Sequence, residues 1–450
     1  MVVPRVFAAV SVATLTFLPA SGTRADVPAL IIDPTVAKIV ASVSSERLRL
    51  MDAKLVSFGT RSTFSEKLGS RRGVFAARAW IQDQFRTIAR TSGGRMTVAL
   101  DSYVQKADAK RIPRDVEISS VIATLHGDDP AGRTYVISSH YDSRNSSNDD
   151  ASKDAPGADD NGSGTVCVLE AARALAATPV HATVIFATFD SEEQGLLGAA
   201  HFVKTLKDAG VNVAGDLNND IIGASVGDDG VHRDNHVRIF SEALPLGGVR
   251  RDVNLVGSEN DSPSRELARF AKETGERYVP KMQVTMVYRA DRFLRGGDHE
   301  AFNDAGFPAI RYVEPRETFS HQHQDVRVEN GVQYGDLIDY VDFAYLARVT
   351  QMNIAALATL AIGPASPQSV QILTRELTND TTLMWKPVPG AVTYEIVHRF
   401  TIEPEWSEAA DVGNVSTATV KFSKDNFIFG VRSVDASGRK SVVAYPVPLR

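Results

Sequence analysis

The sequence predicts an α/β domain with a mostly parallel central sheet flanked by helices, followed by a small all-β sandwich. Three observations lead to this prediction. Up to residue 362, short apolar runs alternate with amphipathic stretches, as strands alternate with helices in such domains. A Gly- and Pro-containing segment at 363–369 then reads as a linker. Beyond it the helical period disappears and short alternating strands take over. The predicted organisation is a leader at 1–25, a main domain at 26–362, the linker, and a terminal module at 370–450.

The elements of the main domain follow from the spacing of its apolar residues. A closing helix is predicted where apolar side chains recur at spacings of three and four from Ile338 to Leu360. Strands are predicted at 135–139, 183–189, 237–240, 283–288 and 309–313. Earlier helices are predicted at 74–89, 162–177, 196–208 and 264–274.

The first 25 residues are typical of an export signal. Arg5 precedes an almost wholly apolar run at 6–18, and Thr23 and Ala25 are small residues three and one before a predicted cleavage point. The apolar run is too short for a comfortable bilayer span. We therefore expect a periplasmic or secreted protein without stable membrane insertion. A buried N-terminal helix and an uncleaved anchor are the alternatives.

Composition limits the classes of function. The chain has 450 residues, of which 43% are hydrophobic and 23% charged, enough for a large core. Its net charge is −6, and loss of Arg5 and Arg24 with the leader would make it −8. Without a basic stripe, nucleic acid is not expected as a partner. Cys167 is the single cysteine, so no internal disulfide can form, and we predict it to be a small buried hydrophobe.

Polar motifs stand at the ends of several predicted strands. His140 ends one strand, Glu193 follows another, and Asp220 follows a short apolar turn at Val211 and Val213. Because ligands bind at the carboxyl ends of parallel strands, these residues are expected to converge. Imidazole and carboxylate without thiolate are ligands that suit two divalent metals such as zinc sharing one bridging carboxylate. The predicted ligand set is His140, Asp160, Glu193, Asp220 and His321.

Each motif alone has an ordinary structural interpretation. His140 could be a surface or core histidine, and Asp159 with Asp160 could form an Asx turn that caps the following helix. Glu192 and Glu193 could be a solvated pair at a helix start. A calcium loop is disfavoured because the spacing of oxygen ligands does not fit. The occurrence of all the motifs in this order favours the metal site.

The motifs SSHYDS, PGADDNGSG, FDSEEQGLLGA, LNNDIIG, GGDHEAF and SHQHQD resemble those of the co-catalytic zinc exopeptidases, which include bacterial leucyl aminopeptidase, aminopeptidase Y and glutamate carboxypeptidase. The resemblance spans about two-thirds of the chain, from residue 68 to 362, and implies the zinc exopeptidase fold with two Zn²⁺ per chain. It implies that His140 and Asp220 bind one zinc and that Glu193 and His321 bind the other. Asp160 would bridge the two ions. Glu192 is implied as the general base, and Asp142 as the residue that supports His140.

The last motif departs from the family pattern. The family usually places an aspartate four residues after the ligand histidine, which favours His321, followed by Asp325, over His323. The family often has a tyrosine directly before this histidine, placed to stabilise an oxyanion. Ser320 stands there in this chain, so a metal, or another residue such as Tyr288 or Tyr312, would have to take over that stabilisation.

The resemblance implies an exported metallo-exopeptidase, in the first place an aminopeptidase acting on peptides. Two metals that share a water would activate it, with Glu192 taking the proton. A carboxypeptidase-like or other amide hydrolase is the alternative, because Arg289, Arg292 and Arg295 could bind a substrate carboxylate rather than form a solvated loop. One-metal glutaminyl-cyclase chemistry and a non-catalytic binding homologue are disfavoured because all five ligands are present.

The terminal module resembles a fibronectin type III domain. Trp385 stands before Pro387, Tyr394 leads the next strand, and FGVRSVDASGRKS follows near the end. Strands are predicted at 381–385, 393–399, 417–422 and 427–434. The module could contact a protein or a cell-wall polymer, but no aromatic cluster indicates such a partner. Its other interpretation is to shield or stabilise the main domain.

Overall fold

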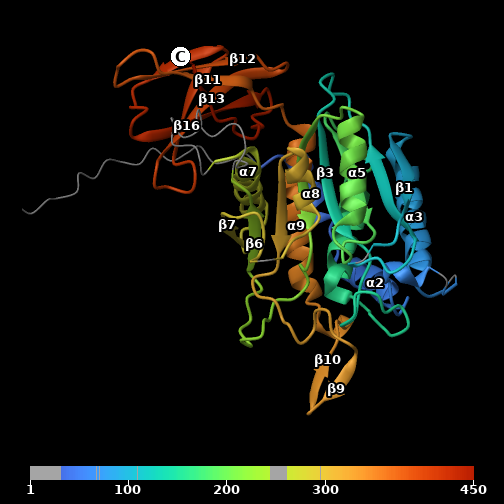
Figure 1. Ribbon diagram of the computed structural model, residues 1–450. Coiled ribbons are helices and arrows are strands. Elements are labelled where there is room, and N and C mark those ends of the chain that lie inside the picture. The colour runs from blue at the N-terminus through green and yellow to red at the C-terminus, as the bar shows by residue number, and fades with distance from the viewer. Residues whose placement is uncertain are drawn as a thin grey trace, which may run out of the picture.

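The computed structural model describes residues 32–66, 68–69, 71–108, 110–243, 261–293 and 295–449. The predicted leader lies outside the described residues. The main domain is built on an eight-stranded sheet with the order β1-β2-β4-β3-β5-β8-β6-β7 (Figure 1). Its strands are β1 (Met96–Gln105), β2 (Val116–Leu125), β3 (Thr134–His140), β4 (Thr183–Phe189), β5 (Val213–Asn219), β6 (His236–Ser241), β7 (Gln283–Val287) and β8 (Ala309–Val313).

The sheet is mixed, with its parallel part at the centre. β4, β3, β5 and β8 run parallel to one another. β2 is antiparallel to both β1 and β4, and β6 is antiparallel to β8. Every residue of β3 is buried, as expected for a parallel strand covered on both faces. The α/β prediction is confirmed, and the carboxyl ends of four central strands meet at one edge of the sheet.

Helices cover both faces of this sheet (Figure 1). On one face, α5 (Leu197–Asp208) and α8 (His299–Ala305) pack through Phe202 and Phe302 against Phe189 of β4. No helix among the described residues is long and apolar enough to cross a membrane. A larger hydrophobic cluster buries the other face beneath α1 (Pro34–Ala41), α2 (Ser45–Val56), α3 (Val74–Ala89), α4 (Gly164–Leu175), α7 (Pro263–Tyr278) and α9 (Phe343–Ile362).

Strand β5 was not predicted because polar side chains occupy its interior positions. Asp216, Asn218 and Asn219 are all fully buried. Ser138 of the neighbouring strand donates a hydrogen bond to Asp216 at 2.8 Å and accepts one from Asn218 at 3.1 Å. Such bonds offset the cost of taking polar groups out of water, so the strand forms without an apolar alternation. β1 and β2 were likewise not among the predicted strands.

The closing helix begins later than its apolar pattern suggests. The periodicity starts at Ile338, but Ile338–Tyr340 form a separate 3₁₀ turn and α9 starts at Phe343. Asp342 is the N-cap, and its side chain accepts hydrogen bonds from the backbone N–H groups of Ala344 and Tyr345, both at 3.0 Å. The helix ends at Ile362, directly before the predicted linker.

The C-terminal residues form the predicted β-sandwich. Its core is made by Trp385, Tyr394 and Phe429 with neighbouring aliphatic side chains. The fibronectin type III resemblance stays a prediction. One sheet has the order β15-β12-β11-β17 and the other β14-β13-β16. The strands are β11 (Gln368–Leu373), β12 (Thr381–Lys386), β13 (Ala391–Phe400), β14 (Glu408–Gly413), β15 (Thr417–Val420), β16 (Phe427–Asp435) and β17 (Val447–Leu449).

The module is held on the main domain by buried polar contacts next to α7. Arg399 of β13 pairs with Asp261 at 2.6 and 2.7 Å, and both side chains are almost fully buried. Trp406 donates from Nε1 to Glu266 of α7 at 2.9 Å. The hydroxyl of Tyr288 donates to the carbonyl oxygen of Pro404 at 2.9 Å. These contacts join the module to the main domain, and the role of the module stays a prediction.

Candidate metal centre

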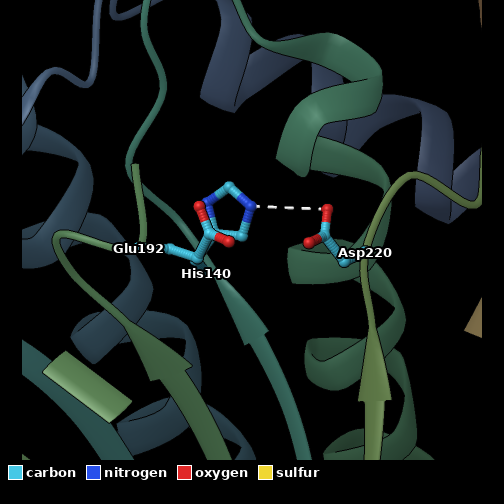
Figure 2. A group of neighbouring side chains, drawn as sticks. All are labelled: His140, Glu192 and Asp220. Atoms are coloured by element: carbon cyan, nitrogen blue, oxygen red, sulfur yellow. Dashed lines mark ion pairs between the residues drawn. The ribbon is translucent and has the colours of Figure 1, made fainter. Parts of the chain in front are cut away.

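Six acidic and histidine side chains gather at the carboxyl edge of the parallel strands. His140 is the last residue of β3, Glu192 and Glu193 follow β4, and Asp220 follows β5. Within each of two groups, one potential ligand atom per residue lies within 4.8 Å of the others. Figure 2 shows the first group, in which His140 and Asp220 face each other. The groups are His140, Glu192 and Asp220, and Asp160, Glu193 and His323.

Asp160 lies between the two groups. Its Oδ1 is 3.3 Å from Nε2 of His140, and its Oδ2 is 2.9 Å from Nε2 of His323. One carboxylate thus faces a histidine of each group, as a bridging ligand would. Its position is fixed by Asp336, which accepts hydrogen bonds from the backbone N–H groups of Asp159 at 2.9 Å and Asp160 at 2.7 Å.

Asp142 orients both His140 and the two glutamates. Nδ1 of His140 lies 3.2 Å from the carbonyl oxygen of Asp142 and 3.4 Å from its Oδ1. Nε2 of the same ring is left facing Asp160 and Asp220. The Asp142 carboxylate also accepts from the backbone N–H groups of Glu192 at 3.1 Å and Glu193 at 3.3 Å. Asp142 therefore occupies the supporting position expected from the sequence.

The structure corrects the choice of the last histidine. His323, not His321, reaches the centre, with its Nε2 3.1 Å from Glu193. His321 stacks on Tyr340 instead, with ring centroids 3.6 Å apart. A turn with φ of +53° at His323 separates the directions of the two side chains. Asp325, whose spacing favoured His321, is bound by Lys153 at 2.8 Å and does not mark the ligand.

The charges of the centre act strongly on one another. Burial opposes ionisation of Asp160, but His323 and His140 hold its pKa well below its ordinary value. Burial likewise disfavours the charged form of His323, but the carboxylates of Glu193 and Asp160 raise its pKa to about 10. Burial also disfavours the charged form of Asp220, whose pKa is nevertheless lowered by Arg311 and His140. The carboxylates that raise the pKa of His323 also favour bound cations.

The buried donor atoms fit zinc. Nε2 of His140, Oε1 of Glu193 and Oδ1 of Asp220 have no hydrogen-bond partner among the described residues. Buried polar atoms without partners are costly, so a ligand that they bind would remove the cost. Imidazole nitrogens and carboxylate oxygens are zinc ligands. The residues present therefore suit zinc at this edge of the sheet.

A third group of acidic and histidine side chains, beside the centre, is not suited to binding a metal. It consists of Asp291, His299 and Glu300. Arg311 binds Asp291 at 2.6 Å, Arg292 binds it at 3.0 Å, and these cations already neutralise it. His299 lies with Nε2 2.8 Å from the carbonyl oxygen of Ala290. We assign Asp291 and His299 a structural role.

The centre opens into a recess of about 610 Å³, a common size for a small-ligand site. The tyrosines considered as oxyanion stabilisers do not line it: Tyr312 is fully buried, and the hydroxyl of Tyr288 bonds the C-terminal module. Ser320 does not line it either. The lining residues are Arg111, Arg144, Asp160, Glu192, Glu193, Gly195, Leu196, Asp220, Ile221, Arg292, Arg295, Gly296, Glu300 and His323.

The sequence did not point to several residues that build the centre. Arg311 lies in the apolar strand β8, is fully buried, and pairs with Asp220 at 2.7 Å. A charge inside a strand predicted to be buried is a usable signal, because such a charge needs a partner. Asp336 gave no signal, since its function depends on backbone groups distant in sequence.

Replacing each histidine separately tests the corrected assignment. His323→Ala is expected to lower the zinc content and to abolish most activity, because its Nε2 contacts both Asp160 and Glu193. His321→Ala is the matched control and should keep the zinc content of the unmodified chain. Metal analysis by mass spectrometry after dialysis measures both. Loss of zinc from His321→Ala with full retention in His323→Ala would contradict the assignment.

A histidine and carboxylate centre at this edge of an α/β sheet defines the class of zinc-dependent hydrolases. Residues 120–332 match the model of peptidase family M28. Over 418 residues the chain is 47% identical to a probable zinc metalloprotease of Leptosphaeria maculans, covering 92% of this chain and 97% of the relative. It is 43% identical to a probable zinc metalloprotease of Pyricularia oryzae, covering 96% and 88%. The chain belongs to peptidase family M28 and is a zinc metalloprotease.

Solved structures share the fold. The LapA aminopeptidase of Legionella pneumophila matches with a TM-score of 0.53 and 18% identity, over 74% of this chain and 76% of that one. An aminopeptidase from Aneurinibacillus sp. strain AM-1 matches with a TM-score of 0.51 and 15% identity, over 73% and 96%. At these identities the likeness shows the fold alone.

Proposed function

We propose that this zinc metalloprotease is an exported two-zinc aminopeptidase, which removes N-terminal residues from peptides. The observation that carries the two-zinc proposal is the position of Asp160, whose two carboxylate oxygens face His140 and His323 separately. Export rests on the predicted leader at 1–25. The description of both solved structures above as aminopeptidases supports the choice of activity.

The proposed ligands divide between the two groups. His140 and Asp220 would hold one zinc, Glu193 and His323 the other, and Asp160 would be shared. Zinc bound in such sites lowers the pKa of a water molecule and polarises a carbonyl oxygen. Arg311, paired with Asp220 at 2.7 Å, and Asp142, beside Nδ1 of His140, fix the orientation of the first group.

Glu192 is proposed to move the proton. It lines the recess beside His140 and Asp220, and its backbone is fixed by Asp142. Glu193 is engaged by His323 and by Arg144, at 3.1 and 3.2 Å, and is suited to ligation instead. Glu192 would take a proton from the attacking water and deliver it to the leaving amine, as a general base and then a general acid do.

A free α-ammonium group needs an acceptor within the recess. Glu300 lines the recess and belongs to neither of the two proposed ligand groups. Its carboxylate is the acceptor that we propose for the substrate amine. Amine recognition by Glu300 would position the first peptide bond next to Glu192 and so favour removal of single N-terminal residues.

Blocking the substrate amine tests the aminopeptidase proposal. Acetylation of the N-terminus of a peptide is expected to lower kcat/KM by about tenfold or more, because a charge-assisted hydrogen bond is lost. Amidation of the C-terminus of a tripeptide should change it much less. Initial rates on the acetylated, amidated and unblocked forms of one tripeptide measure this. Faster turnover of acetylated tripeptides with a free C-terminus would favour the carboxypeptidase-like alternative.

A further inference from the structure

The recess above the centre is lined by four arginines. Arg144 lies near the second group, with Nη2 2.7 Å from Nδ1 of His323. Arg111 donates from Nη1 to the carbonyl oxygen of Glu193 at 3.3 Å. Arg292 and Arg295 reach the recess from the segment that follows β7. Guanidinium groups therefore enter from three separate parts of the chain.

Acidic side chains surround these arginines. Two divalent zinc ions would offset the four carboxylates of the two groups. Outside these groups, the five arginines of the recess and its support, the four above and Arg311, are accompanied by the carboxyl groups of Asp142, Asp291, Asp298, Glu300 and Glu317. Glu317 is itself shared, since Arg292 binds it at 3.1 Å and Arg295 at 2.5 Å. Recognition of a substrate carboxylate therefore depends on the guanidinium groups that the protein leaves exposed.

The net negative charge of the whole chain acts on a substrate over a longer range than the arginines of the recess. The chain carries −6, which favours cationic substrates at a distance. Salt screens that field beyond about 8 Å at physiological ionic strength. Within the recess the nearby guanidinium and carboxylate groups therefore decide which substrate charge is stabilised.

The four arginines differ in how exposed they are and in how many of their guanidinium donors bond protein groups. Arg292 is 9% exposed, and its Nε, Nη1 and Nη2 all donate, to Asp291, Glu317 and Gly296. Arg295 is 31% exposed. Arg111 is exposed, and its guanidinium bonds a main-chain carbonyl rather than a carboxylate. The terminal nitrogens of Arg295 bond Glu317 at 2.5 Å and Gln322 at 3.4 Å. Arg111 and Arg295 are the more exposed of the four arginines, and a substrate carboxylate can reach them.

We propose that Arg111 and Arg295 bind a substrate carboxylate that lies within about one residue of the scissile bond. A recess of this size has room for a dipeptide. The proposal rests on the aminopeptidase function and names its substrate class: short peptides with a carboxylate close to the cleaved bond. The carboxylate could belong to an N-terminal Asp or Glu side chain or to the C-terminus of a dipeptide. Guanidinium is suited to both, because its fork matches a carboxylate.

Neutral and charged substrates of the same shape test the proposal and separate the two sources. The holoenzyme is assayed on Glu-arylamide against Gln-arylamide for the side chain, and on Ala-Ala against Ala-Ala-amide for the C-terminus. We expect kcat/KM to favour the charged member of at least one pair by about tenfold, the size of one partly screened charge-assisted bond. The pair that responds identifies the source of the carboxylate.

Variants assign the effect to the two arginines. Arg111→Gln and Arg295→Gln should each remove most of the preference, because the charged member loses a guanidinium partner that the neutral member does not use. Matched controls are Lys110→Gln, next to Arg111 but outside the recess, and Arg289→Gln, whose guanidinium lies 5.5 Å from the Phe293 ring. Both controls should keep the preference.

Each outcome of these assays supports or contradicts one of the two proposals. Equal or better turnover of both neutral members overturns the proposal, and so does a preference that survives in both arginine variants. Absence of hydrolysis on all four substrates, with zinc bound, contradicts the proposed aminopeptidase function itself. Thermal unfolding of each variant identifies damage to the fold, and for a destabilised Arg295 variant Arg295→Lys, which keeps the charge, should retain part of the preference.

Discussion

Glu192→Gln is expected to lower kcat by about 10²–10⁴-fold while the zinc content stays at the level of the unmodified chain. The amide keeps the size of the side chain and its place beside His140 and Asp220, but it cannot accept a proton from water. The backbone N–H that Asp142 holds is unchanged. Steady-state kinetics together with metal analysis on the same sample measure both quantities.

Glu193→Gln is the matched control because it changes the neighbouring carboxylate. Glu193 lies 3.1 Å from Nε2 of His323 and has a buried oxygen without a hydrogen-bond partner among the described residues. Its replacement should therefore weaken zinc binding first and activity as a consequence, and added zinc should restore part of the rate. The opposite pattern, zinc loss in the Glu192 variant and retention in the Glu193 variant, would exchange the two roles.

The fold class could be predicted because most strands and helices carry an apolar period. β4 and β8 were found as apolar runs, and α9 ends at the predicted linker. β5 was missed because Asp216, Asn218 and Asn219 fill buried positions in it, and their hydrogen bonds are made to a neighbouring strand. The periodicity of a single sequence shows which side chains are polar. It does not show that a buried polar side chain is hydrogen-bonded to a neighbouring strand.

The centre was largely predictable for a topological reason. His140, Glu193 and Asp220 follow parallel strands whose carboxyl ends meet, so the sheet brings them together. The last histidine lies in a turn after β8, where no period constrains direction. There the sequence spacing to Asp325 favoured His321, whereas the backbone at His323 turns that ring towards Asp160. Turn conformation, rather than ligand chemistry, was the missing information.

Asp160→Ala is expected to empty both zinc positions, a larger loss than any other single ligand replacement. Its Oδ1 faces His140 and its Oδ2 faces His323, so its removal takes a ligand from each group. Asp220→Ala removes a side chain of the first group only and should leave zinc with Asp160, Glu193 and His323. Metal analysis of the two variants after dialysis against zinc-free buffer measures the difference.

The turn that carries Asp160 should survive this replacement. Asp336 binds the backbone N–H groups of Asp159 and Asp160, which an alanine retains. Asp160→Ala should therefore fold and unfold cooperatively. Circular dichroism and thermal unfolding check this before the metal content is compared. Because a bridging carboxylate is the one ligand that both ions share, full zinc occupancy in a folded Asp160→Ala variant would rule out the bridging role of Asp160.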